Sequence, residues 1–117
     1  MNDACGGCAQ LSSLDDMLTR IWRTGFDTTR RVELEAFAET ISAPMFRRLP
    51  GCLGYIYAIS EGTWITQTFW ESEDHIRRAE DSAVYQEVVA KIVAAGFLGD
   101  TQTTEIFEVT GYQPPGA

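Results

Sequence analysis

The sequence offers little that would hold a nucleic acid or a membrane. It has 117 residues, with nine lysines and arginines against seventeen acidic residues and a net charge of −8. No basic cluster is longer than an arginine pair such as Arg77 and Arg78, so no surface is expected to face a phosphate backbone. No apolar run approaches the roughly 20 residues that a membrane-spanning helix needs. We therefore expect neither a nucleic-acid partner nor a membrane partner.

A secretory signal is also missing, because the first residues have neither a basic start nor an apolar centre. The expected compartment is therefore the cytoplasm. Hydrophobic residues make up 44% and charged residues 22% of the chain, which is typical of one globular domain. We expect a flexible leader over 1–16, a domain over 17–110 and a C-terminal tail over 111–117.

Cysteine and histidine are scarce, which restricts metal chemistry. Cys5 and Cys8 have the spacing of a zinc or redox pair, but the chain has no second such pair and its third cysteine is Cys52. The preferred interpretation is a leader without function, and a four-thiolate site shared between two subunits stays open. We expect no metal site. We also expect no organic cofactor, since no flavin or nicotinamide fingerprint is present.

Two runs rich in aromatic and β-branched residues, 52–60 and 63–70, are joined by Glu61 and Gly62 and predict a β-hairpin. Opposed residues share a face of a sheet. One face is predicted to carry Leu53, Tyr55, Tyr57, Ile59, Trp64, Thr66, Thr68 and Trp70, and the other Gly54, Ile56, Ala58, Ile65, Gln67 and Phe69. The first face mixes rings with hydroxyls, as a small-molecule pocket does.

The remaining elements complete an α+β ferredoxin-like βαββαβ pattern, a four-stranded antiparallel sheet with helices on one side. The pattern predicts a strand over 17–26, a helix from Asp27 or Thr28 that Pro44 ends or kinks, helices opened by Ser72 and by Asp81 or Ser82, and a strand over 103–109. The helices cover one face only. The other face carries Ile56, Ile65 and Phe69, and a face-to-face homodimer would cover it.

Two segments resemble a known family. Residues 49–54 read Leu-Pro-Gly-Cys-Leu-Gly and residues 69–74 read Phe-Trp-Glu-Ser-Glu-Asp, which is similar to the antibiotic biosynthesis monooxygenases. The resemblance covers about residues 17–110. It implies a dimeric α+β barrel in which each subunit keeps a pocket between sheet and helices. The family includes cofactor-free oxygenases of quinol-like polyketides, small quinol monooxygenases, haem-degrading enzymes and members without known activity. The resemblance implies that this chain is similar to one of these classes.

The resemblance is carried over position by position. Trp70 matches the motif tryptophan, whereas Thr66 and Ile76 stand where polyketide-oxidising members have an asparagine and a tyrosine. In the haem-degrading members, the iron-ligating histidine aligns with Val89 and a pocket tryptophan with Ala79, so haem chemistry is not expected.

These considerations give two hypotheses. The first is a cofactor-independent monooxygenase that oxidises a small quinol-like or polyketide aromatic substrate with molecular oxygen. The second is a non-catalytic dimeric protein that binds a small molecule in the same pocket. Trp70 and Thr66 are the predicted catalytic residues, and the predicted substrate-binding residues are Tyr55, Tyr57, Trp22 and His75.

Overall fold

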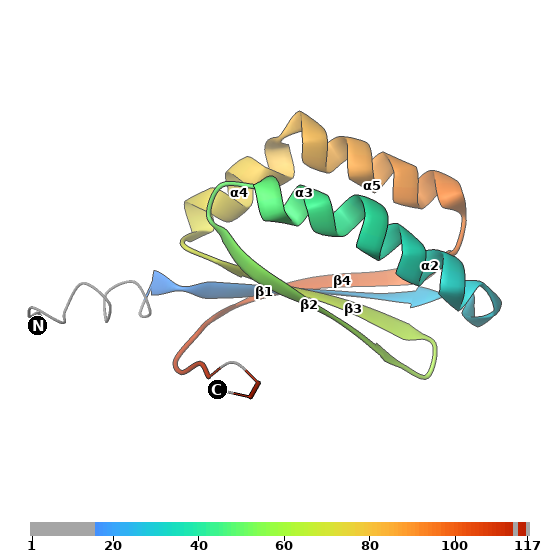
Figure 1. Ribbon diagram of the computed structural model, residues 1–117, viewed down its shortest axis with the longest axis horizontal. Coiled ribbons are helices and arrows are strands. Elements are labelled where there is room, and N and C mark those ends of the chain that lie inside the picture. The colour runs from blue at the N-terminus through green and yellow to red at the C-terminus, as the bar shows by residue number, and fades with distance from the viewer. Residues whose placement is uncertain (1–15, 114, 117) are drawn as a thin grey trace, which may run out of the picture.

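The computed structural model describes residues 16–113 and 115–116, so Cys5 and Cys8 lie outside the described residues. In this part of the chain, four strands form one antiparallel sheet in the order β2-β3-β1-β4. The strands are β1 (Leu18–Phe26), β2 (Cys52–Ser60), β3 (Thr63–Trp70) and β4 (Leu98–Glu108). All the helices lie on one side of this sheet (Figure 1). The predicted α+β ferredoxin-like architecture is confirmed.

The first helical layer follows β1 and is irregular in the middle. A 3-10 turn, η1 (Thr28–Arg30), opens at Asp27, whose carboxylate accepts the Thr29 N–H at 3.0 Å. It leads into α2 (Arg31–Phe37), a π-helical segment η2 (Ala38–Ser42) and α3 (Ala43–Arg48). Pro44 explains why the helix widens into a π-helical segment, because proline lacks an N–H and its ring clashes with the carbonyl four residues earlier. Pro44 was expected to end or kink the helix, and the structure instead has a π-helical segment before it and helical residues as far as Arg48.

The second helical layer consists of α4 (Glu73–Asp81) and α5 (Ala83–Ala95). The Ser72 and Ser82 hydroxyls accept backbone N–H groups at the starts of these helices, as the sequence predicts. Gly96, with φ of 79°, ends α5 in the left-handed conformation that favours glycine. The chain then enters β4 at Leu98, five residues before the predicted start of that strand.

The hairpin register is confirmed over most of its length. Tyr57 pairs with Thr66 and Ile59 with Trp64, as a two-residue turn requires. The expected pairing of Leu53 with Trp70 is wrong. A β-bulge between Cys52 and Gly54 sets Cys52 opposite Trp70 and leaves Leu53 50% exposed.

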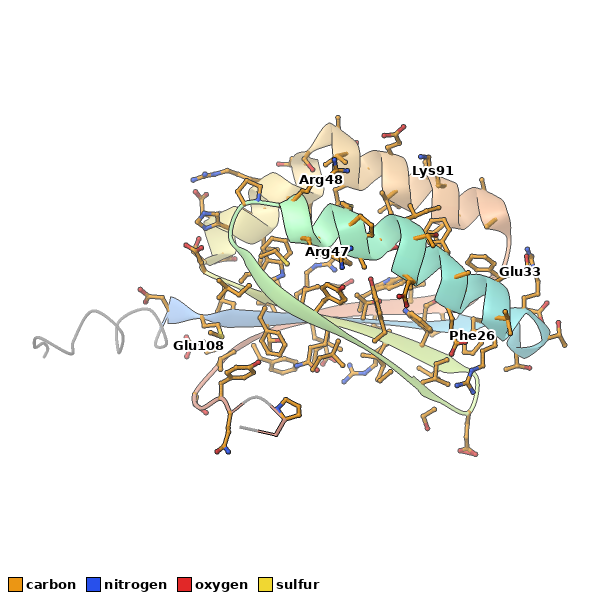
Figure 2. All side chains as sticks on the ribbon, in the orientation of Figure 1. Phe26, Glu33, Arg47, Arg48, Lys91 and Glu108 are labelled. Atoms are coloured by element: carbon orange, nitrogen blue, oxygen red, sulfur yellow. The ribbon has the colours of Figure 1, made fainter. Side chains whose placement is uncertain are left out.

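Two hydrophobic clusters fill the space between the helices and the sheet (Figure 2). The first core cluster is Phe26, Leu34, Phe37, Ala38, Trp64, Ile92 and Phe97. The second core cluster is Met45, Phe46, Leu49, Trp70, Ile76 and Ala79. Each cluster therefore contains one tryptophan of β3.

The opposite face of the sheet, here called the outer face, is covered by no helix within the described residues (Figure 1). Ile56 is 46% exposed and Phe107 is 45% exposed on it. Arg23 forms an ion pair with Glu105 across this face. Arg20 points to the helix side, where its Nε donates to a Glu80 carboxylate oxygen at 2.9 Å. Among the described residues, no helix is long and apolar enough to cross a membrane.

Candidate functional site

An apolar cavity lies between the first helical layer, α5 and the helix-facing side of the sheet. Its volume is about 80 Å³. It is lined by Trp22, Leu34, Ala38, Ser42, Met45, Phe46, Tyr57, Trp64, Thr66, Tyr85, Val88, Val89, Ile92, Val93, Leu98 and Gln102. Val89, Val93 and Gln102 are exposed, so the cavity opens to solvent between α5 and β4. Pockets for drug-sized ligands measure roughly 300 Å³ or more, so this cavity suits a smaller molecule.

The floor of the cavity is a row of three side chains on neighbouring strands. Thr66 of β3 pairs with Tyr57 of β2 on one side and with Trp22 of β1 on the other. Opposed residues in antiparallel strands share a face, so two aromatic rings flank one hydroxyl. Trp64 lies two residues before Thr66 and adds a third ring, whose centroid is 5.4 Å from that of Tyr57.

The hydroxyl groups of the floor have specific partners. The Trp64 indole Nε1–H donates to Thr66 Oγ1 at 2.9 Å, and Tyr57 O–H donates to the Ala38 carbonyl at 3.3 Å. Thr66 is 6% exposed, and its own hydroxyl proton has no acceptor among the described residues. This buried donor is therefore available to a molecule in the cavity.

The cavity is electrostatically neutral. In the described lining, Tyr57 and Tyr85 are the only ionisable side chains. Burial raises the pKa of Tyr57 well above its usual range, and burial also raises the pKa of Tyr85, against the opposing effect of Arg20, whose guanidinium carbon lies 5.9 Å from the Tyr85 ring centroid. Both phenols are therefore neutral at physiological pH, and neither can serve as a base there.

Three of the six predicted site residues line the cavity, namely Trp22, Tyr57 and Thr66. The structure places Trp70, Tyr55 and His75 elsewhere. Trp70 is buried in the second core cluster, where its Nε1–H donates to Thr68 Oγ1 at 2.7 Å. Its predicted catalytic role stays a prediction, although the indole is not part of the cavity lining.

Tyr55 packs against Phe46 and accepts a hydrogen bond from Arg47 Nη1 at 2.8 Å, where Arg47 extends from α3 toward the sheet (Figure 2). His75 is on α4, and its Nδ1 lies 2.7 Å from Ser72 Oγ. His75 lines a separate hollow with Pro50 and Arg78. The substrate-binding roles of Tyr55 and His75 also stay predictions.

Sequence reasoning missed the cavity residues that come from helices and from β4. Ser42 follows Ala38 and Leu34 at intervals of four, so all three lie on the helix face toward the cavity. That spacing was the sequence signal that could have identified Ser42. No sequence signal could have identified Gln102, because its place at the mouth depends on how β4 pairs with β1.

The positions to which the resemblance assigns roles are divided between the cavity and the second core cluster. Val89 lines the mouth of the cavity, whereas Ile76 and Ala79 are buried in the second core cluster. Within the described residues, no group of three or more His, Cys, Asp or Glu side chains is placed to hold a metal ion.

Comparison with known proteins agrees with this architecture. The family model for antibiotic biosynthesis monooxygenases matches residues 21–91, which is more than half of the chain. The chain therefore belongs to the antibiotic biosynthesis monooxygenase family. No curated protein gives a significant match.

Among solved structures, the chain resembles SnoaB, a cofactor-independent oxygenase from Streptomyces nogalater, at 19% identity with a TM-score of 0.67, covering 87% of this chain and 99% of SnoaB. A protein from Caulobacter crescentus classed as an antibiotic biosynthesis monooxygenase is 15% identical, with a TM-score of 0.70 and coverage of 88% and 98%. A protein of unknown function from Nitrosomonas europaea is 14% identical, with the same TM-score of 0.70 and coverage of 88% and 98%. At these identities the structural similarity establishes the fold.

Proposed function

We propose that this chain is a cofactor-independent monooxygenase that oxidises a small quinol-like aromatic substrate with molecular oxygen. The observation that carries the proposal is the cavity floor, where the Thr66 hydroxyl proton has no acceptor in the described part of the chain and lies between the rings of Tyr57 and Trp22. Flanking rings can stack on an aromatic substrate, and the free donor can bind one of its oxygens. Membership of the family and the likeness to SnoaB support the same reaction class.

The proposed reaction balances without any external reductant. One atom of O₂ forms a carbon–oxygen bond at a ring carbon of the quinol, and that carbon loses its hydrogen. The other oxygen atom leaves as water. A quinol thus becomes a hydroxyquinone, and the substrate itself supplies all four electrons that reduce O₂.

The residues of the cavity would bind and orient the substrate. Thr66 donates to the substrate oxygen on which negative charge develops as the ring loses electrons, and such a donor counts for more in a water-poor cavity. Trp22 and Tyr57 hold the ring plane. No lining residue described can act as a base at neutral pH, so the proton of the substrate passes to water at the mouth beside Gln102.

Oxygen uptake with a panel of one-ring and two-ring quinols tests the proposal. We expect one O₂ consumed per substrate and no hydrogen peroxide released. With ¹⁸O₂, one labelled atom should appear in the hydroxyquinone and one in water. Release of one H₂O₂ per quinol would indicate simple oxidation and contradict the monooxygenase assignment.

The second candidate is a binding protein that uses the same cavity without turnover. The absence of any Asp, Glu, His, Lys or Arg from the described lining favours it, because nothing there would ionise the substrate. Binding of quinols by calorimetry, with no oxygen uptake above the rate in buffer, would establish this second function and exclude the first.

We also propose a homodimer formed through the outer face, in a cytoplasmic protein. Ile65 lies on this face, paired with Ala58 on one side and Arg23 on the other, and no helix in residues 16–113 covers it. Ile65→Lys should give a monomer or an aggregate by light scattering, because it puts a charge into the interface. Lys in place of the exposed Val32 on α2 is the control and should leave the dimer intact. A dimer of unchanged stability in Ile65→Lys would place the interface elsewhere.

A further inference from the structure

A second buried hydroxyl faces the cavity from the helix side. Ser42 is 9% exposed, lines the cavity, and has no hydrogen-bond partner for its side chain among the described residues. A buried hydroxyl that lacks a partner destabilises a protein, so its presence requires an explanation.

The π-helical segment explains why Ser42 is left without a partner. A helical serine ordinarily donates to the carbonyl four residues earlier, which here belongs to Ala38. That carbonyl already accepts the Ala43 N–H and the Tyr57 O–H. A carbonyl oxygen has two lone pairs, so none remains for Ser42. In the same segment, the exposed Thr40 hydroxyl does make this bond, to the Ala36 carbonyl at 2.7 Å.

Ser42 and Thr66 lie on opposite walls of the cavity. Ser42 belongs to the first helical layer and Thr66 to the sheet. The other lining residues are apolar or aromatic, apart from the two neutral tyrosines and Gln102 at the mouth. The two available hydroxyls therefore line one cavity from opposite walls.

We infer that Ser42 is a specificity-determining residue and that, with Thr66, it selects an uncharged one-ring aromatic with oxygens at opposite ring positions, a para-quinol or its quinone. This inference rests on the proposed function for the identity of the site and extends it to the substrate class. The small volume of about 80 Å³ selects one ring, and the neutral lining disfavours a phenolate or carboxylate.

The test measures binding without turnover, by calorimetry with oxygen excluded. The probes are hydroquinone and 4-methylphenol, which have the same shape but two hydroxyls and one hydroxyl respectively. Wild-type protein should bind hydroquinone more tightly. Ser42→Ala should weaken hydroquinone binding about tenfold, the effect of one lost hydrogen bond, and should remove most of the preference over 4-methylphenol.

Thermal unfolding of the ligand-free protein supplies a second readout. Ser42→Ala removes an unpaired buried hydroxyl and adds a better helix former, so its Tm should rise by a few degrees. A combination of higher stability and weaker binding is what a ligand-binding hydroxyl predicts. The control is Thr40→Ala, which removes the neighbouring exposed hydroxyl and should leave both affinities unchanged.

Equal hydroquinone affinity in Ser42→Ala and wild type would overturn the inference, as would the same loss in Thr40→Ala. Failure of hydroquinone to bind wild-type protein would overturn the substrate class. Failure of the proposed reaction can be distinguished from failure of the inference about Ser42. Ser42-dependent binding without oxygen uptake would support the role of Ser42 and contradict the monooxygenase proposal. Oxygen uptake that is insensitive to Ser42→Ala would support the monooxygenase proposal and contradict the role of Ser42.

Discussion

Strand β3 contains the same side-chain pair twice, and the two copies differ in one hydrogen bond. Trp64 donates its indole N–H to Thr66, and Trp70 donates its indole N–H to Thr68. Thr68 passes its own proton to the Arg20 carbonyl at 3.4 Å, whereas Thr66 has no acceptor among the described residues.

The two pairs also differ in their surroundings, since one is packed in a core and the other borders a cavity. Trp70 and Thr68 are each 1% exposed, and Trp70 is packed in the second core cluster. Trp64 and Thr66 line the cavity beside the first core cluster. The pair near Trp70 is therefore complete within the protein, and the pair near Trp64 leaves one bond for a ligand. The comparison teaches that two tryptophans six residues apart on one strand can have different surroundings, one enclosed in a core cluster and the other bordering a cavity.

The largest expected difference is between Thr66→Val and Thr68→Val. Valine has the shape of threonine without the hydroxyl, so each change deletes the same group. Thr66→Val should reduce kcat for quinol oxidation on the order of a hundredfold, as when one oxyanion donor is lost. Thr68→Val should lower the free energy of unfolding by about 2 kcal/mol, because two hydrogen bonds are lost, with kcat within a few-fold of wild type.

Oxygen uptake and urea unfolding measure the two quantities. Thr66→Ser keeps the hydroxyl and should restore most of the activity. If Thr68→Val abolished turnover and Thr66→Val did not, the active site would have to be assigned to the second core cluster.

Enlarging a buried alanine in each cluster compares their packing. Ala38 and Ala79 are each 4% exposed and helical, but Ala38 borders the cavity. Ala79→Leu should destabilise the protein by about 1–3 kcal/mol, because extra methylenes do not fit a filled core. Ala38→Leu should be tolerated better and should weaken substrate binding, since the added atoms enter the cavity. Similar losses of stability by urea unfolding would show that the two regions are packed alike.

Replacing each tryptophan with phenylalanine separates the roles of Trp64 and Trp70. Trp70→Phe keeps most of the ring area and deletes one donor, so unfolding should become easier by about 1 kcal/mol, with turnover within twofold of wild type. Trp64→Phe should alter KM, because the ring lines the cavity proposed to bind the substrate. A hundredfold loss of turnover in Trp70→Phe, with an unchanged fold by circular dichroism, would support the predicted catalytic role of Trp70.

The smallest expected effect is on stability at alkaline pH. Burial raises the pKa of Tyr57 above that of an unfolded tyrosine, so the unfolded state loses its proton first as pH rises above about 10. The stability that Tyr57 contributes is complete below that pH and is lost above it. Tyr57→Phe should therefore show a shallower decline in the free energy of unfolding between about pH 9 and 11. An equal decline in both proteins would mean that the phenol is solvated.

Part of the site could be predicted from the sequence, because it depends on local rules. The alternation of side chains in a strand and the two-residue turn at Glu61 and Gly62 bring Tyr57 opposite Thr66, and the structure keeps that pairing. The same rule failed at Leu53, where a bulge inserts one residue and reverses the facing of the side chain. Leu53 had no sequence signal of its own for this irregularity.

The helical contribution to the site could not be predicted in the same way. Apolar spacing can indicate the buried face of a helix, but not which part of that face borders a cavity. For α5, the apolar residues Val84 and Val89 are exposed whereas Ile92 is buried, so this helix presents only part of its apolar surface to the core.

The sequence by itself determined the order of elements, the helix caps, the turn and the face of β3 that carries its tryptophans and threonines. These features depend on backbone preferences and on interactions within a few residues. Only the tertiary structure decided that Trp70 is enclosed and Trp64 borders a cavity. That difference depends on how closely two helical layers approach one sheet, which is set by the packing of side chains distant in the chain.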